Sequence, residues 1–194
     1  IKEIVSDADV VIHLAGITDV AYTKTESNVE KDTLIRTTAI RGTRNIIDNI
    51  TNDCKLIFPS THVVYEGFEE TKTDVEESVP PCPVLTYAKS KVQSEVDLME
   101  SDKNYVVLRL ASVYGYSTDT MRMNIMPNLF SKIASQNGTI KLFSGGVQLK
   151  SIVPLLDVAR CMKFMAENAE VSRETFHISK ESTSVKEVAQ ICKE

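Results

Sequence analysis

The sequence predicts an α/β fold with a doubly wound parallel sheet, because short apolar runs alternate with longer helical stretches. Apolar runs typical of buried strands occupy residues 10–16, 55–58 and 105–110. Stretches of ten or more residues with helical periodicity lie between them, and parallel strands need crossover connections of about that length. We therefore expect residues 1–116 to form the sheet domain, and residues 117–194 mainly a smaller lobe with segments that return to the sheet.

The composition is that of an ordinary globular protein, with 42% hydrophobic and 25% charged residues. A net charge of −5 provides no basic surface, which argues against nucleic acid as a partner. No apolar run reaches the roughly 18 residues of a membrane span, and no signal peptide opens the chain. The four cysteines are far apart and lack the spacing of a metal site or a disulfide framework. We expect a cytoplasmic protein with reduced thiols, no membrane association and no metal.

The first predicted strand ends in two small residues. The β-branched residues at positions 10–12 indicate a strand buried on both faces, and His13 is expected to be a packed core histidine. Ala15 and Gly16 follow at the carboxyl end, where they would let a ligand approach the backbone closely. Ligands of open α/β sheets bind outside the carboxyl ends of the strands, although a tight turn explains the same two residues equally well.

A helix and a second strand are expected next. Apolar residues at three- and four-residue steps between positions 29 and 50 predict the helix, inside which Gly42 is expected to allow close packing against the sheet. The strand at residues 55–58 leads into two hydroxyl residues, Ser60 and Thr61. These hydroxyl groups are therefore expected at the same rim of the sheet as the small residues after the first strand.

The main chemical signal is the pair Tyr87 and Lys91, four residues apart in a segment of good helix formers. On a helix this spacing puts the phenol and the ammonium group on one face, with Cβ atoms about 5–6 Å apart. A cation about 6 Å from a phenolate contributes roughly 2.8 kcal/mol at an effective dielectric constant near 20, or about two pKa units. A tyrosine that titrates at about pH 8 can exchange protons at neutral pH, so the pair is a candidate acid/base centre. The alternative is a pair on an exposed helix face, since so short a motif also occurs by chance.

The remaining elements follow from the same patterns. The predicted order is a brief extension of the strand at 63–65, an acidic surface loop at 66–83, a helix from Tyr87 to about residue 100, a strand at 105–110, a helix at 124–134, a strand at 140–143, an extended segment at 152–153, a helix at 155–167 and a strand at 175–178. Ser184 and Glu187 have the spacing of a capping box, which predicts the start of the last helix.

Six segments, in order along the chain, resemble the extended short-chain dehydrogenases/reductases, in particular the NAD-dependent epimerase/dehydratase group that acts on nucleotide sugars. The segments are Val11-Ile12-His13-Leu14-Ala15-Gly16, Gly42-Thr43, Ser60-Thr61 with Val64-Tyr65, Tyr87 with Lys91, Arg109 with Val113-Tyr114-Gly115, and Asn124-Ile125-Met126-Pro127 with Gly146, Gln148, Lys150 and Asp157-Val158-Ala159. The resemblance covers nearly the whole chain. It implies a Rossmann-like fold, NAD or NADP as the cofactor, a nucleotide sugar as the substrate, and a homodimer.

The resemblance also implies roles for individual residues. Thr61 and Tyr87 would hold and deprotonate the reacting hydroxyl group, and Lys91 would lower the pKa of Tyr87 and bind the nicotinamide ribose. The residues expected to contact the cofactor are Leu14, Ala15, Gly16, Tyr87, Lys91 and Ala111. The residues expected to bind the substrate are Thr61, Ser112, Asn124, Ile125 and Lys150.

Several departures from the family pattern narrow the expectation. Ala39 replaces an Asn that helps to organise the proton relay, and His62 and Val63 replace the Asp-Glu of dehydratases, which argues against dehydration. Lys150 replaces an Arg that grips the diphosphate, and lysine lacks the bidentate fork. The glycine-rich turn that cradles the pyrophosphate is absent, so we expect the parent protein to carry it before Ile1. Without that part, the first strand would be a bare apolar edge.

We therefore predict an NAD(P)-dependent nucleotide-sugar epimerase or a closely related oxidoreductase. One alternative is an NAD(P)H-dependent 4-ketosugar reductase, which would use the same three catalytic residues but release its oxidised cofactor. A second alternative is a non-catalytic NAD(P)-binding regulator of the same fold, although such a protein has no need of all three catalytic residues.

Overall fold

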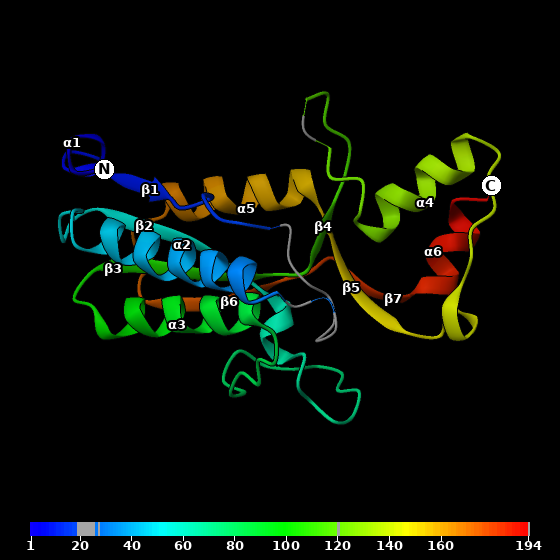
Figure 1. The fold of residues 1–194 in the computed structure, drawn as a ribbon. Helices are drawn as coiled ribbons and strands as arrows, with labels where there is room; N and C mark the ends of the chain where they lie inside the picture. The colour runs from blue at the N-terminus through cyan, green and yellow to red at the C-terminus, as the bar shows by residue number, and fades with distance from the viewer. Residues whose placement is uncertain (19–25, 27, 120, 194) are drawn as a thin grey trace. The chain divides into compact units, whose positions relative to one another are not determined.

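The fold was determined as a computed structural model, which describes residues 1–18, 26, 28–119 and 121–193. In chain order the elements are α1 (Lys2–Val5), β1 (Val10–Ile12), α2 (Val29–Ile47), β2 (Lys55–Thr61), the 3-10 helix η2 (His62–Tyr65), α3 (Thr86–Glu100), β3 (Asn104–Leu110), β4 (Ser112–Tyr114), α4 (Met126–Ser135), the 3-10 helix η3 (Phe143–Gly146), β5 (Leu149–Pro154), α5 (Leu155–Glu167), β6 (Glu174–Ile178), β7 (Glu181–Ser184) and α6 (Val185–Ile191) (Figure 1). Among the described residues, none of these helices has both the length and the hydrophobicity of a membrane span.

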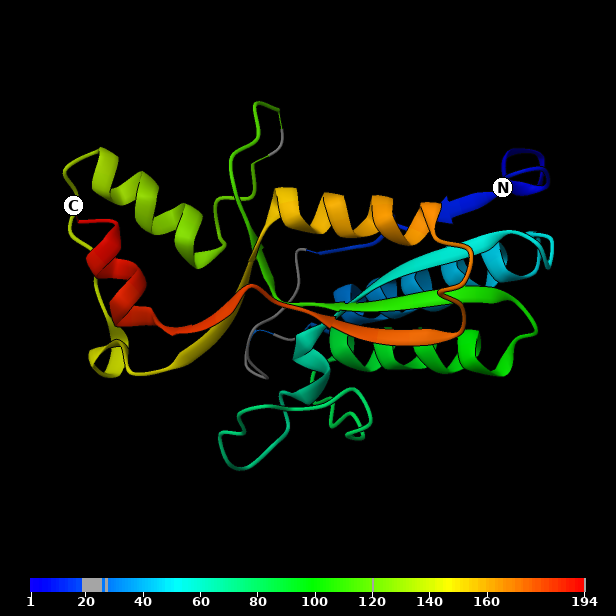
Figure 2. The same cartoon turned by 180° about the vertical axis from the view of Figure 1, so that it is seen from behind.

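The chain forms two compact units. The first contains residues 1–109 and 162–177, and the second contains residues 110–161 and 178–194. The sheet of the first unit has the strand order β1-β2-β3-β6, and β1 pairs with β2 in parallel. Figures 1 and 2 show α2 and α3 together on one face of this sheet, and the end of α5 that belongs to the first unit on the other face. The predicted α/β fold with a parallel sheet is confirmed.

The two central strands are buried on both faces, as their continuous apolar sequences predict. All seven residues of β2 are buried, and so are the five inner residues of β3. Leu56 and Phe58 pack into one core cluster with Tyr105 and Val107. The helices contribute the buried side chains Ile46, Ile47 and Leu98 to this cluster. The core therefore fixes α3 directly over β2 and β3, which positions the residues of the candidate site.

A buried lysine of β2 binds the end of α5 on the other face of the sheet. The amine of Lys55, at the start of β2, donates hydrogen bonds to the carbonyl oxygens of Met165 at 3.0 Å and Asn168 at 2.5 Å. These carbonyl groups lie at the carboxyl end of α5, where the partial negative charge of a helix end favours a cation. The contact thus satisfies the buried amine and ties α5 to the sheet.

The first strand differs from its prediction. It ends at Ile12 and lies at the edge of the described sheet, where it has one hydrogen-bonded neighbour. Its three residues are half-buried or exposed, so it is not buried on both faces. The side chain of Ile12 is 40% exposed and that of Leu14 is 69% exposed. The apolar run indicated a strand correctly, but periodicity gives no information on the number of strands beside it. The expectation of an apolar edge at this strand is met.

Three further local predictions are wrong. Residues 63–65 lie in η2 and not in an extended strand, because the Thr61 hydroxyl oxygen accepts a hydrogen bond from the Val63 backbone and turns the chain. Residues 140–143 do not form a strand. A Cβ atom at Gly42 would meet no atom within 4 Å, so this glycine does not serve close packing against the sheet.

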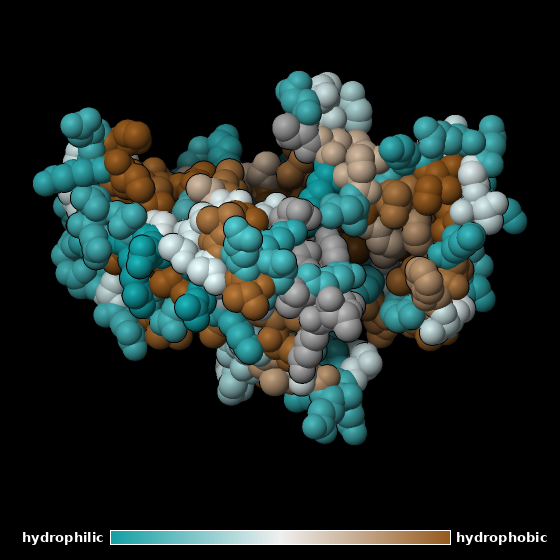
Figure 3. Space-filling view, in the orientation of Figure 1, coloured by the Kyte–Doolittle hydropathy of each residue, from teal (hydrophilic) through white to brown (hydrophobic). Residues whose placement is uncertain are grey.

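The second unit contains a three-stranded sheet and two packed helices. Its strand order is β4-β5-β7, with β4 parallel and β7 antiparallel to β5. The predicted capping box is present: Ser184 and Glu187 satisfy each other's backbone groups at the start of α6. Phe130 of α4 packs with Val188 and Ala189 of α6. Hydrophobic side chains gather over this helical region in Figure 3.

Candidate functional site

The structure brings Tyr87 and Lys91 together near the start of α3. The helix begins at Thr86, as expected, and the two residues are one turn apart. The Lys91 amine lies 6.0 Å from the centre of the Tyr87 ring. At this distance the ammonium charge can act on the phenol, and both residues are only partly exposed to water.

The Lys91 amine is held by the neighbouring strand. It donates a 2.7 Å hydrogen bond to the carbonyl oxygen of Pro59 and lies 4.5 Å from the centre of the Phe58 ring. Burial lowers the pKa of Lys91 from 10.5 to about 8, and the nearby Glu95 carboxylate acts in the opposite direction. The amine is therefore charged below about pH 8 and loses its charge as the pH rises through that value.

Thr61 is the last residue of β2, two residues beyond the carbonyl group that Lys91 contacts. Its side chain is buried, and its hydroxyl oxygen accepts a 3.3 Å hydrogen bond from the backbone N–H of Val63. Because α3 packs against both β2 and η2, the strand end with Thr61 and the helix with Tyr87 are adjacent elements of the same unit.

The residues expected to contact the cofactor along the first strand lie at the same rim as Thr61. Leu14, Ala15 and Gly16 follow β1 and are exposed. Since β1 and β2 are parallel, their carboxyl ends point to one edge of the sheet. A Cβ atom at Gly16 would meet no atom within 4 Å, so the surrounding described chain leaves space at this position.

His13 is buried behind this rim. Its Nε2 lies 3.2 Å from the Thr43 hydroxyl oxygen, which itself donates to the carbonyl oxygen of Ala39, so Nε2–H is the donor. Burial, together with the charge of Lys91, lowers the pKa of His13 to about 4. The described residues contain no group of three or more His, Cys, Asp or Glu side chains that could hold a metal ion.

The buried His13 predicts a loss of stability in acid. Its folded-state pKa is below the unfolded value of 6.5, so the unfolded state binds more protons between pH 6.5 and 4. We expect the free energy of unfolding to fall by about 2 kcal/mol across this range, after allowance for solvent screening. Urea unfolding of the wild type and of His13→Gln at pH 7 and pH 4.5 measures this contribution. An equal acid-induced loss in the two proteins would contradict it.

The other predicted residues lie in the second unit. Ser112 pairs with Ile152 between β4 and β5, and Lys150 is exposed opposite Thr183 between β5 and β7. Ala111 is buried just before β4. Asn124 and Ile125 precede α4; the Asn124 side chain accepts a 2.8 Å hydrogen bond from Arg122, and Ile125 is the N-cap residue. All of these contacts lie within the second unit. They do not test the cofactor and substrate roles of these residues, which stay predictions.

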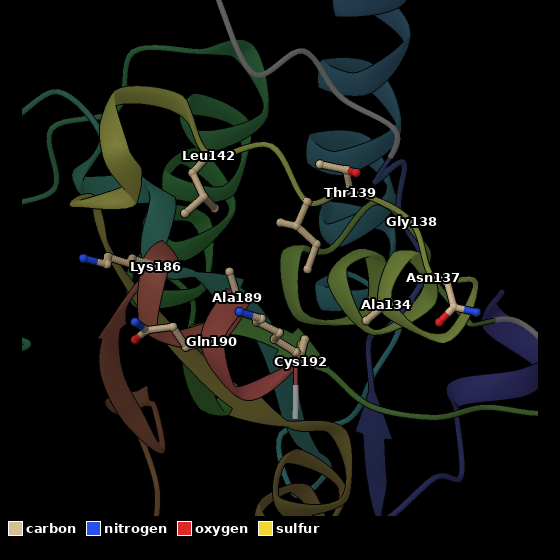
Figure 4. Close-up of a pocket in the computed structure, with 11 residues that line it drawn as sticks. Ala134, Asn137, Gly138, Thr139, Leu142, Lys186, Ala189, Gln190 and Cys192 are labelled. Atoms are coloured by element: carbon tan, nitrogen blue, oxygen red, sulfur yellow. The ribbon is translucent and has the colours of Figure 1, made fainter.

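An open pocket of about 580 Å³ in the second unit contains none of the predicted residues. It lies between the end of α4 and α6, and Figure 4 shows Ala134, Leu142 and Ala189 among its mostly apolar walls.

Sequence reasoning missed one buried charge beside the site. Glu95 is four residues beyond Lys91 on α3, is 2% exposed, and forms an ion pair with Arg109 of β3 at 2.7 Å. The four-residue repeat Tyr87, Lys91, Glu95 was visible in the sequence and places all three side chains along one helix face. Only the structure shows that Glu95 has a buried partner.

Comparisons with known proteins agree with this architecture. The sequence model of the NAD dependent epimerase/dehydratase family matches residues 1–179. Over 138 residues the chain is 31% identical to the probable low-salt glycan biosynthesis reductase Agl14 of Haloferax volcanii; the match covers 71% of this chain and 44% of that protein.

Solved structures of nucleotide-sugar epimerases have the same fold. The UDP-glucose 4-epimerase of Thermotoga maritima, solved with UDP-glucose, is 24% identical, with a TM-score of 0.81, 95% of this chain covered and 60% of that one. A variant of the Bacillus cereus UDP-glucuronic acid 4-epimerase, solved with UDP-4-deoxy-4-fluoro-glucuronic acid and NAD, is 24% identical, with a TM-score of 0.80, 98% of this chain covered and 60% of that one. The chain thus spans less than two thirds of the length of these relatives.

Proposed function

Because the chain belongs to the NAD dependent epimerase/dehydratase family, we propose that the whole protein is an NAD(P)-dependent epimerase of nucleotide sugars. The observation that carries the proposal is the Tyr87–Lys91 pair, with the amine 6.0 Å from the phenol ring, on the helix beside the strand that ends in Thr61. A homodimer, as the sequence resemblance implies, belongs to the same proposal.

The residues present fit a nicotinamide cofactor. Residues 14–16 are exposed at the carboxyl end of β1, with space at Gly16, and would lie against it. Lys91 has an ammonium group with three donors, of which the Pro59 carbonyl group takes one, so the amine can also hold ribose hydroxyl groups. The bound cofactor would supply the hydride acceptor and, in the reverse direction, the hydride donor, so that return to the opposite face of the sugar inverts one carbon.

The chain's own side chains handle the proton. Thr61 hydrogen-bonds the oxygen of the reacting sugar hydroxyl group, and Tyr87 as the phenolate accepts the proton of that hydroxyl group. The Lys91 charge favours the phenolate, because an opposite charge nearby favours the ionised form. In the reverse step Tyr87 returns the proton to the sugar oxygen, so the enzyme ends in the state in which it began.

A 4-ketosugar reductase is the second candidate, and the similarity to a reductase over 71% of the chain favours it. It would use the same three side chains, with Tyr87 donating a proton to the ketone oxygen. The two functions differ in cofactor balance: the epimerase returns its cofactor to the starting redox state, whereas the reductase consumes one reduced cofactor per turnover.

This difference defines the test. The whole protein is incubated with UDP-glucose, UDP-glucuronic acid or UDP-N-acetylglucosamine and NAD⁺, and the sugars are followed by proton NMR while absorbance reports reduced cofactor. Conversion to the C4 epimer without net cofactor reduction supports the epimerase. Turnover only with a 4-keto sugar and stoichiometric NADH or NADPH supports the reductase. Failure to bind cofactor and to convert any of these sugars would overturn both.

A further inference from the structure

A continuous hydrogen-bonded chain of buried and half-buried polar side chains runs from the end of β2 to the acidic loop that precedes α3. Its members come from five different elements of the first unit: Ser60, Glu95, Arg109, Tyr65 and His177. Ser60, Glu95 and Arg109 are at most 4% exposed. The proposed proton transfer uses none of these side chains.

Glu95 is the centre of this chain. Its Oε1 accepts a hydrogen bond from the Ser60 hydroxyl group, and both of its oxygens accept from Arg109, with Nη2 to Oε2 at 2.7 Å and Nε to Oε2 at 3.2 Å. Replacing a buried ion pair with apolar side chains is often neutral or stabilising. A contribution to stability is therefore a weak explanation for the Glu95–Arg109 ion pair, and the position of the pair provides a better explanation.

That position is next to the contact between Lys91 and the end of β2. Ser60 directly follows Pro59, whose carbonyl group binds Lys91, and directly precedes Thr61. Glu95 is on the same helix as Lys91, one turn further along. The Ser60–Glu95 hydrogen bond thus joins the strand end to the helix directly beside the contact between Lys91 and Pro59.

The outer end of the hydrogen-bonded chain binds the acidic loop. Arg109 Nη1 donates to the Tyr65 hydroxyl oxygen and, at 3.2 Å, to the Glu77 carbonyl oxygen. The Tyr65 hydroxyl oxygen lies 3.0 Å from His177 Nε2. Burial raises the pKa of Tyr65, so its hydroxyl group stays protonated and donates a hydrogen bond to this nitrogen. His177 Nδ1 is then the protonated nitrogen and donates to the Val75 carbonyl oxygen at 2.9 Å. The loop is held at two carbonyl groups.

We propose that Glu95 and Arg109 are positioning residues, which hold the Thr61 end of β2 in register with Tyr87 and Lys91 and couple that register to the acidic loop at residues 66–83. This inference rests on the proposed function for its catalytic consequence. Glu95 acts through Ser60 on the strand, and Arg109 acts through Tyr65 and Glu77 on the loop. Neither side chain touches the substrate or exchanges a proton with it.

The catalytic test compares Glu95→Gln with a matched control in the whole protein. A displacement of about 1 Å can lower a rate about 100-fold, so we expect kcat of Glu95→Gln to fall by about 10- to 100-fold with KM changed less than about threefold. Asp97→Asn is the control, because Asp97 is also a carboxylate of α3 paired with an arginine, but its partner at 2.7 Å is Arg44 of α2 and not a residue of β3. The control should keep its kcat.

A second variant guards against a folding defect. Ser60→Ala removes only the hydroxyl group that joins β2 to Glu95 and leaves the Glu95–Arg109 ion pair in place. We expect the same loss of kcat at nearly constant KM, with a thermal midpoint within about 4 °C of the wild type. If Glu95→Gln does not fold, the Ser60→Ala result decides the catalytic consequence.

Hydrogen exchange tests the coupling without any turnover. Amide exchange of residues 61–85 should be faster by about tenfold or more in Glu95→Gln and unchanged in Asp97→Asn. Unchanged exchange in Glu95→Gln overturns the coupling, and faster exchange with unaltered kcat overturns the positioning role. A wild-type protein that fails to turn over overturns the proposed function and the catalytic part of this inference, whereas the exchange result still decides the coupling.

Discussion

Replacement of Tyr87 with Phe is expected to lower kcat by about 10²- to 10⁴-fold, the usual contribution of a positioned acid or base. The substitution removes one oxygen and keeps the ring, which lies 6.0 Å from the Lys91 amine. Cofactor affinity and the thermal midpoint should therefore change little. The measurements are steady-state turnover of the whole protein, cofactor titration and thermal unfolding, made on the same preparation.

Tyr105→Phe provides the control for this experiment. Tyr105 is a buried tyrosine near the start of β3 and is not a residue of the candidate site. This variant therefore loses a tyrosine hydroxyl group outside the candidate site. We expect kcat of this variant to remain close to that of the wild type. Wild-type turnover in Tyr87→Phe would rule out the acid/base assignment. Cofactor binding without turnover in the wild type itself would favour the non-catalytic regulator.

The parts of the fold that the sequence predicts well are those set by local patterns. The helix from Tyr87 to residue 100 needs only its spacing and its helix formers, and α3 spans Thr86–Glu100. Residues 55–58 and 105–110 are uninterrupted apolar runs, which is the pattern of strands buried on both faces, and β2 and β3 are the central strands. The pairing of Tyr87 with Lys91 follows from the same helical period.

The parts that were missed depend on partners far away in the sequence. The first strand has the same apolar pattern as β2, but how far its residues are buried depends on the neighbours that they have in the whole sheet. Strand β7, Glu181–Ser184, has no apolar alternation and exists because it pairs with β5. The hydrogen bond between Ser60 and Glu95 spans 35 residues. Nothing in the local sequence identifies these contacts.

Burial changes the electrostatics that the sequence suggests for the candidate site. From spacing alone, Lys91 is a fully charged cation that favours the ionised form of Tyr87. In the structure, burial lowers the pKa of Lys91 to about 8, so that effect weakens as the pH rises through this value. Below about pH 8 the amine keeps its charge, although it has lost the solvation by water that it has in the unfolded chain. This loss of solvation is a free-energy penalty on the folded protein.

The last prediction follows from this penalty: Lys91→Met should stabilise the folded protein while it impairs catalysis. Lowering the pKa from 10.5 to about 8 corresponds to roughly 3 kcal/mol at pH 7. Loss of the hydrogen bond to the Pro59 carbonyl group offsets about 1 kcal/mol of this gain. We expect the free energy of unfolding, measured with urea at pH 7, to rise by about 2 kcal/mol.

The pH dependence separates this cause from a simple gain in packing. Between pH 8 and 10.5 the unfolded wild type binds more protons at Lys91 than the folded protein, so the stability of the wild type rises with pH. The advantage of Lys91→Met should therefore shrink across this range, whereas a packing effect would persist. Lys89→Met, at an exposed position of the same helix, should change stability little at either pH. Destabilisation by Lys91→Met at pH 7 would mean that the charged amine supports the fold, and that the candidate site carries no stored penalty.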